Sequence, residues 1–541
     1  MMSRGRAIGL NAVVAAASFA ATADRARTPS TPPLALAPDS MPHIATVDER
    51  FLSYNVEMAE VIGGNFWKPY TPESISKLEA EAARTSQRTG AAPVGTDTSM
   101  FQARPPIDLT NPRLRRLAAA LGPAYVRVSG TWANSVYFHD SSTPAPATPP
   151  SGFSGVLTRP QWKGVVDFAH AVNAEIVTSF AISAGVRNAA GVWTPVEAKP
   201  FLAYTKSVGG RIAAAEMFNE PTMPVYGGAP EGYGAASYAR DFAVFRPFVK
   251  RTAPDMLILG PGSVGEGRGS GLLSGIAAGD ILPTEQLLSA TPHPAFDVFS
   301  YHYYGAASIR CAAQAPEAQT SAAAALSDAW LSRVDTVNAF YERLRDRYEP
   351  GRKVWITEMA DAACGGNPWA STFLDTFRFM DQHGRLARRG VQVIFHNTLA
   401  SSAYGLLDED TFLPRPNYWA ALLWQRLMGT AVLDPGPSPP GLHLYAHCLR
   451  NHPGGVTVLA INTSRTEPAS LILPTATERY TLTAAALEDA RVRLNGHELA
   501  LGANDALPDL HGLHTPAGRV ELAPASITFL AIPDASNASC R

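Results

Sequence analysis

Short apolar runs alternate with longer amphipathic segments through most of this chain. Eight runs are apolar enough to form buried strands, and they are 51–58, 124–130, 174–183, 212–220, 256–262, 296–304, 353–359 and 391–399. Segments with helical periodicity lie between them, including 114–121, 161–172, 237–251, 324–348 and 371–384. Apolar strands that alternate with helices are typical of a parallel sheet covered by helices, and eight such units favour closure into a barrel. An open, doubly wound sheet is the alternative.

The pattern changes after the Pro- and Gly-rich stretch PGPSPPG at 435–441. From there on, short β-type runs are separated by Asn-Gly and Gly-Gly turn signals, with hardly any helical periodicity. We therefore predict an α/β fold, with a (β/α)8 TIM barrel over 43–434 and a small all-β domain, a β-sandwich, over 435–541. Residues 24–42 are rich in Pro, Ser and Ala, and we expect them to be a linker that does not pack.

The N-terminus has the pattern of an export signal. Arg4 and Arg6 precede an alanine-rich apolar run that ends in Ala21-Thr22-Ala23, the small-x-small pattern of a signal peptidase site. We predict that residues 1–23 are a signal peptide and that the protein is secreted or periplasmic. No later stretch reaches the ~20 unbroken apolar residues of a membrane-spanning helix, so we expect no membrane span.

Composition narrows the possible partners. The chain has 541 residues, of which 46% are hydrophobic and 17% charged, so it can bury a large core in more than one domain. Its formal net charge of −2 leaves no basic excess to hold a phosphate backbone, which argues against nucleic acid. The four cysteines match no CxxC metal pattern and allow two disulfides in any of three pairings, one of which joins Cys448 to Cys540.

One glycine motif resembles a nucleotide site. Residues 260–265 read GPGSVG and satisfy GxGxxG directly after a strand. The dinucleotide fingerprint requires a helix to begin at that point, whereas the next residues are GEGRGSG, and such glycine density opposes helix formation. We interpret the motif as a glycine-rich barrel loop and expect neither an organic cofactor nor a metal.

Two glutamates stand where predicted strands end. Glu220 follows the fourth strand within Asn219-Glu220-Pro221, and Glu358 ends the seventh. The active site of a βα barrel lies at the C-terminal ends of its strands. One protonated and one ionised carboxylate on that rim suit double displacement at a sugar acetal, and Asn219 could bond the sugar 2-hydroxyl. Taken singly, each glutamate could instead be a surface residue of a loop.

At these residues the chain resembles the clan of retaining (β/α)8 glycosidases, and more narrowly glycoside hydrolase family 79, the heparanase and β-glucuronidase family. The similar segments cover nearly the whole mature chain and include FLSYNVEMAEVIGG, YVRVSGTWAN, YHYYG and SAYGLLDEDTFLPRPNYWAALLWQRLMGT. The resemblance implies a retaining enzyme specific for β-linked glucuronic acid. Glu220 would be its acid/base and Glu358 its nucleophile.

The resemblance also implies a sugar pocket. Its further residues would be Glu57, Thr131, His302, Tyr304, Gly365, Gly366 and Tyr404. Glu57 stands where the animal enzymes of the family would have an aspartate, and His302 and Tyr304 would orient the nucleophile or touch the sugar. The two glycines would bind the uronate carboxylate through backbone N–H groups, a role for which a plain turn is the alternative. Cys364, just before the glycines, departs from the family pattern. Bonded to Cys311 it would tether two active-site loops, and as a free thiol it would be an incidental small residue.

Several functions remain in competition. We favour exo-β-glucuronidase action over endo-cleavage of a glycosaminoglycan such as heparan sulfate, because a sulfated chain requires clustered Lys and Arg. The loop GSVGEGRGSGLL after the fifth strand holds a single arginine, although Arg113, Arg115 and Arg116 cannot be placed from sequence. A non-catalytic polysaccharide-binding barrel would have lost one of the carboxylates, and a relative that acts on neutral sugars such as xylosides would need no glycine pair.

Overall fold

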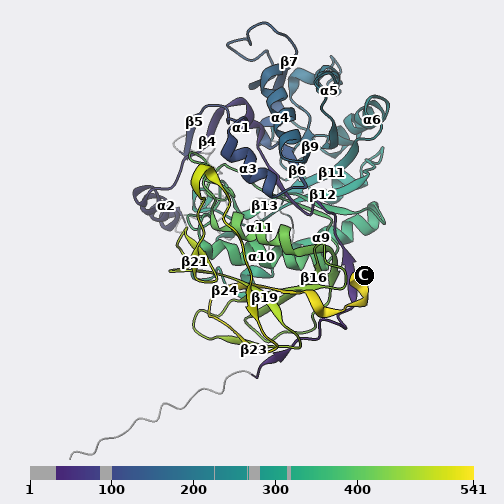
Figure 1. Ribbon diagram of the computed structural model, residues 1–541. Helices are drawn as coiled ribbons and strands as arrows, with labels where there is room; N and C mark the ends of the chain where they lie inside the picture. Colours follow the sequence, from purple (N-terminus) through teal and green to yellow (C-terminus); the bar gives the residue numbers. More distant parts are fainter. Residues whose placement is uncertain (1–31, 86–99, 225, 265, 267–280, 313–317) are drawn as a thin grey trace, which may run out of the picture.

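The computed structural model describes residues 32–85, 100–224, 226–264, 266, 281–312 and 318–541, so the predicted signal peptide and most of the glycine-rich loop lie outside the described residues. A closed barrel of parallel strands forms the centre, in the order β10-β11-β12-β13-β14-β3-β6-β9 (Figure 1). Its strands are β3 (Leu52–Asn55), β6 (Ala124–Val128), β9 (Ala174–Ser179), β10 (Ile212–Glu216), β11 (Leu257–Val264), β12 (Val298–Ala307), β13 (Val354–Ala363) and β14 (Val393–His396). The predicted barrel is confirmed, and each of the eight apolar runs supplies one strand.

Helices surround the barrel. They are α1 (Met58–Ile62), α2 (Pro72–Thr85), α3 (Pro112–Ala120), α4 (Arg159–Ala171), α5 (Ala198–Ser207), α6 (Ala235–Thr252), α7 (Thr284–Ser289), α8 (Asp328–Leu331), α9 (Arg333–Tyr348), α10 (Phe373–Arg388) and α11 (Pro416–Leu427). Local sequence fixes where several begin. Thr158 and Gln161 form a capping box at α4, and the Asn111 side chain caps α3, which starts with a proline. The small ribbons β4 (Gly64–Trp67) with β5 (Phe101–Arg104) and β7 (Val136–His139) with β8 (Gly155–Thr158) lie in βα loops.

A second region is built from two sheets. The larger contains β2 (His43–Thr46), β15 (Met428–Leu433), β16 (Leu442–Leu449), β17 (Val456–Asn462), β24 (Ser526–Ile532), β19 (Thr477–Ala484), β20 (Val492–Leu494), β21 (His497–Glu498) and β22 (Leu513–Thr515). The smaller contains β1 (Leu34–Ala35), β18 (Ala469–Leu473) and β23 (Gly518–Leu522). Apolar side chains of both sheets share one core, so the predicted all-β domain is present.

The predicted linker over 24–42 is wrong for its described part. β1 pairs with β18, and Leu36 and Met41 are buried in the core between the two sheets, because apolar residues are spaced among the prolines. The predicted domain boundary also moves, since β2 and β15 belong to the larger sheet and not to the barrel. In Figure 1 the purple N-terminal segment accordingly runs along the yellow C-terminal domain.

The larger sheet is buried on both faces. In β17, Val458 and Ala460 face the core between the sheets, while Leu459 and Ile461 join the main core of the barrel. Alternate residues of a strand point to opposite faces, so each neighbour serves a different core. The β-domain and the barrel therefore share one sheet, which packs against the barrel helices α10 and α11.

Two disulfides reinforce this arrangement. Cys448 on β16 is bonded to Cys540 near the C-terminus, and Cys311 after β12 is bonded to Cys364 after β13. Of the three pairings that the sequence allowed, the structure contains the one that tethers the two loops. Among the helices of the described ranges, none combines the length and the apolarity needed to cross a membrane.

A polar cluster joins the β-domain to the barrel. His443 on β16 bonds through Nδ1 to Asp381 of α10 and through Nε2 to Asp328, at 2.8 Å. The Tyr445 hydroxyl and the Arg385 guanidinium also donate to Asp381, each at 2.6 Å. Burial opposes a charge on the imidazole, but the bonds to Asp381 and its negative charge outweigh burial, so the pKa of His443 is raised.

Replacing His443 with glutamine should therefore destabilise the protein in a pH-dependent way. A raised pKa means that the stabilising charge is fully present below the ordinary value of about 6.5 and is lost as pH rises through the higher folded value. We expect a loss of about 2 kcal/mol in the free energy of unfolding at pH 6, and a smaller loss at pH 9. Urea unfolding at both pH values measures this, with the exposed His452→Gln as control. A pH-independent loss would contradict it.

Candidate active site

Glu358 lies within a strand and not at its end, contrary to the sequence prediction. β13 runs five residues further, to Ala363, because small side chains let it stay paired with β12. Its last pairing with its other neighbour, β14, joins Met359 to His396. The barrel wall therefore stops at the level of Glu358, whose side chain stands on the C-terminal rim, and beyond it β12 and β13 continue as a pair.

Glu220 lies in the turn beyond β10, which ends at Glu216. Its φ is +52°, a left-handed conformation that a non-glycine residue keeps only when its surroundings impose it. Asn134 imposes it here, because its side chain accepts from the Asn219 N–H at 2.8 Å and donates to the Asn219 carbonyl at 2.9 Å. This clamp directs the Glu220 carboxylate towards the centre of the rim.

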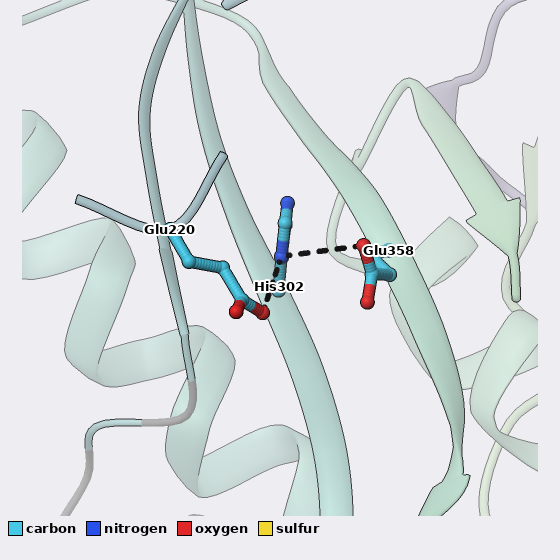
Figure 2. A group of neighbouring side chains, drawn as sticks. All are labelled: Glu220, His302 and Glu358. Carbon is cyan, nitrogen blue, oxygen red and sulfur yellow. Dashed lines mark hydrogen bonds and ion pairs between the residues drawn. The ribbon is translucent and has the colours of Figure 1, made fainter. Parts of the chain in front are cut away.

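The two glutamates face each other across a histidine (Figure 2). Nδ1 of His302 lies 3.0 Å from an oxygen of Glu220 and 3.7 Å from an oxygen of Glu358. One carboxylate oxygen of each glutamate and one ring nitrogen of His302 all lie within 4.8 Å of one another. Carboxyl groups ~5–5.5 Å apart are typical of retaining glycosidases, whereas inverting enzymes leave ~6.5–9.5 Å for a water. The spacing fits the retaining geometry.

His302 has a raised pKa. Its burial opposes the charged form, but the negative charge of Glu358 and the hydrogen bond to Glu220 outweigh that effect. A positively polarised imidazole between two carboxylates reduces their mutual repulsion. His302 therefore lies within reach of both carboxylates, between Glu220 and Glu358.

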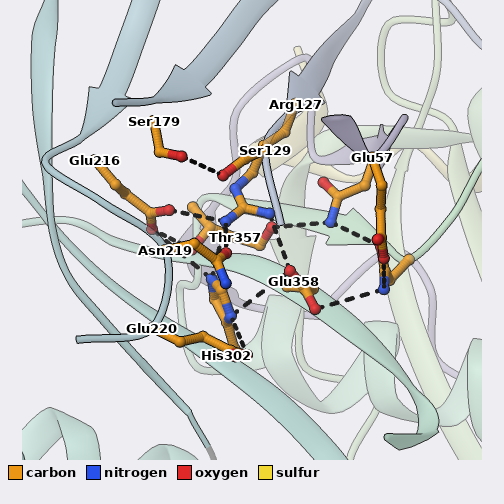
Figure 3. Close-up of polar contacts among 12 residues, drawn as sticks. Glu57, Arg127, Ser129, Ser179, Glu216, Asn219, Glu220, His302, Thr357 and Glu358 are labelled. Atoms are coloured by element: carbon orange, nitrogen blue, oxygen red, sulfur yellow. Dashed lines mark hydrogen bonds and ion pairs between the residues drawn. The ribbon is translucent and has the colours of Figure 1, made fainter. Parts of the chain in front are cut away.

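Arg127 connects several residues of the rim (Figure 3). Its side chain is 1% exposed, and its guanidinium donates to Glu358 at 3.0 Å, to Glu216 at 2.9 Å and to the Asn219 side chain at 2.7 Å. Burial would raise the pKa of Glu216, but Arg127, His302 and a hydrogen bond from a threonine lower it overall. Arg127 thus connects the turn that carries Asn219 and Glu220 to Glu358 in one network.

The sequence analysis did not single out Arg127 or Glu216. Both stand inside apolar strand runs, AYVRVSG and IAAAEMFNE, where a charged residue is uncommon unless it is paired. That signal was available. Their mutual pairing was not, because it joins β6 to β10 across the barrel interior.

Asn397, after β14, is a third residue that was not predicted from the sequence. Its amide nitrogen lies 2.9 Å from the Tyr304 hydroxyl and 3.2 Å from both the Glu57 carboxylate and the Tyr404 hydroxyl. Tyr304 in turn donates a short hydrogen bond to Glu358. Three predicted site residues, Glu57, Tyr304 and Tyr404, are therefore brought to Glu358 by one asparagine.

Glu57 has an unusual titration. Burial and the nearby negative charge of Glu358 raise its pKa to about 8, although the hydrogen bond from Asn397 works against them. At neutral pH a carboxyl with this pKa is largely protonated and can donate a hydrogen bond. Gly130 passes beside Glu57, so close that a β-carbon there would lie 3.3 Å from the Glu57 carboxylate, and Thr131 follows it directly. Glu57 and Thr131, both predicted to line the sugar pocket, therefore lie on neighbouring segments of the rim.

The predicted glycine pair adopts a conformation that favours glycine. Gly365 and Gly366 have φ values of +79° and +81°, and a β-carbon on Gly365 would lie 2.6 Å from the Trp67 ring. A β-carbon on Gly366 would lie 3.0 Å from the Tyr404 ring. The structure therefore brings the glycines and Tyr404 together, as predicted. The first five residues of the GxGxxG motif, 260–264, belong to β11, so this part of the motif is strand and not the predicted barrel loop.

A metal is a less suitable occupant of the centre than a sugar. Glu220, His302 and Glu358 are the group of potential ligands close enough for one ion in the described part of the chain. Both oxygens of Glu358, however, already accept hydrogen bonds, one from Arg127 and one from Tyr304. A cation would stand beside the guanidinium, whose charge repels it. The donor set therefore fits proton transfer better than metal binding.

A (β/α)8 barrel followed by a β-domain, with two facing glutamates on the C-terminal rim, is the architecture of retaining barrel glycosidases. A crystal structure of a 4-O-α-L-rhamnosyl-β-D-glucuronidase from Fusarium oxysporum has this fold. It matches with a TM-score of 0.57 and 13% sequence identity, covering 92% of this chain and all of that one.

The sequence comparisons point to one group of proteins. No protein-family model matches the chain. Heparanase-like protein 1 of Arabidopsis thaliana is 29% identical over 378 residues, which cover 66% of this chain and 65% of that protein. Baicalin-β-D-glucuronidase of Scutellaria baicalensis is 31% identical over 218 residues, which cover 37% and 41%. The chain thus spans less than two thirds of these relatives. Its homologues are heparanase-like proteins and a β-glucuronidase, which confirms the resemblance to glycoside hydrolase family 79.

Proposed function

We propose that this protein is a retaining exo-β-glucuronidase, which removes terminal β-D-glucuronic acid by double displacement. The proposal rests on the close approach of Glu220 and Glu358. One carboxylate oxygen of each and one ring nitrogen of His302 all lie within 4.8 Å of one another. The name of one relative, baicalin-β-D-glucuronidase, supports a glucuronide as substrate. The substrate partner is then a glucuronic-acid-containing glycoside, with no cofactor required.

In the first step, Glu358 attacks the anomeric carbon and the glycosidic bond breaks. Arg127 and Tyr304 each donate a hydrogen bond to Glu358 and orient it for this attack. Glu220 donates a proton to the departing oxygen, so that the aglycone leaves as a neutral alcohol or phenol. One oxygen of Glu220 accepts from His302, which leaves the other to carry that proton. The product of this step is a glucuronyl ester of Glu358.

In the second step, Glu220, now ionised, takes a proton from water. The water oxygen attacks the anomeric carbon from the face that the aglycone left, the ester bond to Glu358 breaks, and β-glucuronic acid is released. Asn219 supports both steps. Its side-chain oxygen accepts from Arg127, which turns its amide nitrogen towards the position of the sugar 2-hydroxyl.

Exo action is supported by what surrounds the site. The partly buried apolar side chains that pack beside Tyr304 and Tyr404 are Trp67, Met223, Ile281, Cys364 and Ala403. Arg113 and Arg116, candidates for a sulfate-binding cluster, instead contact Asp505 and the Asn504 carbonyl of the C-terminal domain. An apolar surrounding suits the aglycone of a small glucuronide better than a sulfated polysaccharide.

We also infer that the protein acts outside the cytoplasm, in a secreted or periplasmic form. Its two disulfides support this, because such bonds form and persist in oxidising compartments.

The test is hydrolysis of nitrophenyl β-D-glucuronide by the purified protein, followed by NMR in the first minutes. The expected first product is the β-anomer of glucuronic acid. Initial release of the α-anomer would reject the retaining mechanism. Cleavage confined to heparan sulfate oligosaccharides would establish endo action, turnover of xylosides alone would reject a uronide, and binding without turnover would indicate a non-catalytic protein.

The raised pKa of Glu57 predicts an alkaline loss of activity. As pH rises through about 8, Glu57 loses its proton, so it loses a donor to the sugar and adds a negative charge beside Glu358. We expect kcat/KM on the nitrophenyl glucuronide to fall about tenfold between pH 7 and pH 9. In Glu57→Gln the amide stays neutral, and this fall should disappear. An unchanged alkaline limb in that variant would show that another group titrates.

A further inference from the structure

Arg310 differs from the other buried arginines. Among the described residues, three arginines are fully buried: Arg127, Arg310 and Arg378. Arg127 pairs with two glutamates and Arg378 with Asp375 at 2.6 Å. Arg310 is 4% exposed, yet forms no ion pair with any carboxylate of the described chain. Two carboxylates, Asp361 and Glu409, act on its charge without forming an ion pair with it. A buried charge is costly unless a counter-charge balances it, so the positive charge of Arg310 is only partly balanced.

Backbone carbonyls and an aromatic ring hold Arg310 in place. Nη1 donates to the Cys364 carbonyl at 3.1 Å and to the Gly366 carbonyl at 3.3 Å, and Nη2 donates to the Lys68 carbonyl at 2.8 Å. The guanidinium lies 3.7 Å from the centre of the Tyr70 ring. Burial lowers the pKa of Arg310. These neutral groups position the cation without neutralising it.

The Arg310 guanidinium lies on the carbonyl side of the loop that contains Gly365 and Gly366. A β-carbon on Gly365 would be 2.8 Å from Nη1, so only backbone separates the cation from the other side of the loop. In a trans peptide the carbonyl and the N–H point in opposite directions. The Cys364 carbonyl faces Arg310, so the N–H of Gly365 points away from it. A carbonyl bonded to a cation also makes its own N–H a stronger donor.

We propose that Arg310 makes this site selective for uronic acids, because its charge helps to balance the substrate carboxylate across the peptide that joins Cys364 to Gly365; the next N–H that faces away from Arg310, that of Asn367, already donates to Asp361. The carboxylate would lie on the N–H side of that loop, within reach of the Tyr404 hydroxyl. A neutral hexoside has a hydroxymethyl group at that position and would gain nothing from the cation. The inference deepens the proposed function and rests on it. Arg310 acts through the peptide and is a positioning residue.

The experiment compares Arg310→Met and Arg310→Lys with the wild type on nitrophenyl β-D-glucuronide and nitrophenyl β-D-glucoside. In Arg310→Met we expect kcat/KM on the glucuronide to fall about 10- to 100-fold, mainly through KM, and that on the glucoside to change much less. Arg310→Lys should keep part of the selectivity because it keeps the charge. Calorimetry should show weaker binding of free D-glucuronate in the same order, and thermal unfolding reports on the fold.

Arg415 provides a matched control. It also holds loop carbonyls, those of Ser402 at 2.7 Å and Ala403 at 3.2 Å, but it has a carboxylate partner in Asp408 at 3.3 Å. Arg415→Met should lower kcat/KM by the same factor on the glucuronide and on the glucoside. If Arg310→Met lowered kcat/KM equally on both substrates, or left the ratio of the two values unchanged, the role of Arg310 would be rejected while the proposed function would stand. A wild type that neither cleaves the glucuronide nor binds glucuronate would reject the proposed function itself. If Arg310→Met does not fold, the ratio of kcat/KM on the glucuronide to kcat/KM on the glucoside is compared between Arg310→Lys and the wild type instead.

Discussion

Replacing Glu358 with glutamine should lower kcat/KM on nitrophenyl β-D-glucuronide by ~10³-fold or more. The amide has no negative charge with which to attack the anomeric carbon, and no other described carboxylate on the rim is held by both a guanidinium and a tyrosine hydroxyl. Initial rates under saturating and limiting substrate measure the loss. The fold should survive, because Arg127 keeps its pairing with Glu216.

Glu349→Gln is the matched control. Glu349 is also buried, but it follows the last residue of α9 and precedes β13, at the opposite end of the barrel. Its carboxylate is hydrogen-bonded to His293. Its replacement should leave the rate within a few-fold of the wild type. Retention of a tenth or more of the activity in Glu358→Gln would remove this residue from the nucleophile role.

Azide can then separate the roles of the two glutamates. In Glu358→Ala, azide replaces the missing nucleophile and attacks from its face, so the product should be the α-glucuronosyl azide. In Glu220→Ala the glucuronyl ester still forms with a good leaving group, and azide then gives the β-azide. The opposite assignment of the two products would exchange the roles proposed here.

Arg127→Met should have the largest effect on stability. The substitution leaves Glu216 and Glu358 buried without their common cation, and breaking a buried pair from one side costs ~3–5 kcal/mol. Denaturant unfolding measures this loss, and activity should disappear with it. Adding Glu216→Gln to Arg127→Met removes one of the orphaned charges and should recover part of the stability.

A surface ion pair supplies the comparison. Arg159 and Asp140 are each about one third exposed, and Arg159→Met should cost ~1 kcal/mol or less. An Arg127→Met protein that loses no more than this control, or that gains nothing from Glu216→Gln, would show that the network does not depend on the guanidinium.

The barrel could be predicted because its strands are local apolar runs. Each strand is buried on both sides and separated by amphipathic helices, so its pattern is visible without knowledge of its neighbours. Glu220 could be found for a similar reason, since a carboxylate directly after such a run is exceptional. The family resemblance supplied Glu57, Tyr304 and Tyr404, which neither strand periodicity nor charge would have indicated.

What escaped prediction depends on contacts between distant parts of the chain. Asn397 is an unremarkable residue until the fold brings Glu57, Tyr304 and Tyr404 to it. The end of β13 could not be read from sequence, because its last residues are alanines, which have no strand preference and are held by pairing with β12. The packing of Leu36 and Met41 likewise requires the C-terminal strands.

The sheet shared by barrel and β-domain has a consequence for biogenesis. Ala45 on β2 pairs with Val432 on β15, and β1 pairs with β18, so strands at the start of the chain find partners only when synthesis is almost complete. The barrel helices α10 and α11 remain uncovered until that sheet forms on them. The two N-terminal strands therefore stay unpaired until β15 and β18 have been synthesised, and until then the helix faces that the sheet covers are exposed to chaperones.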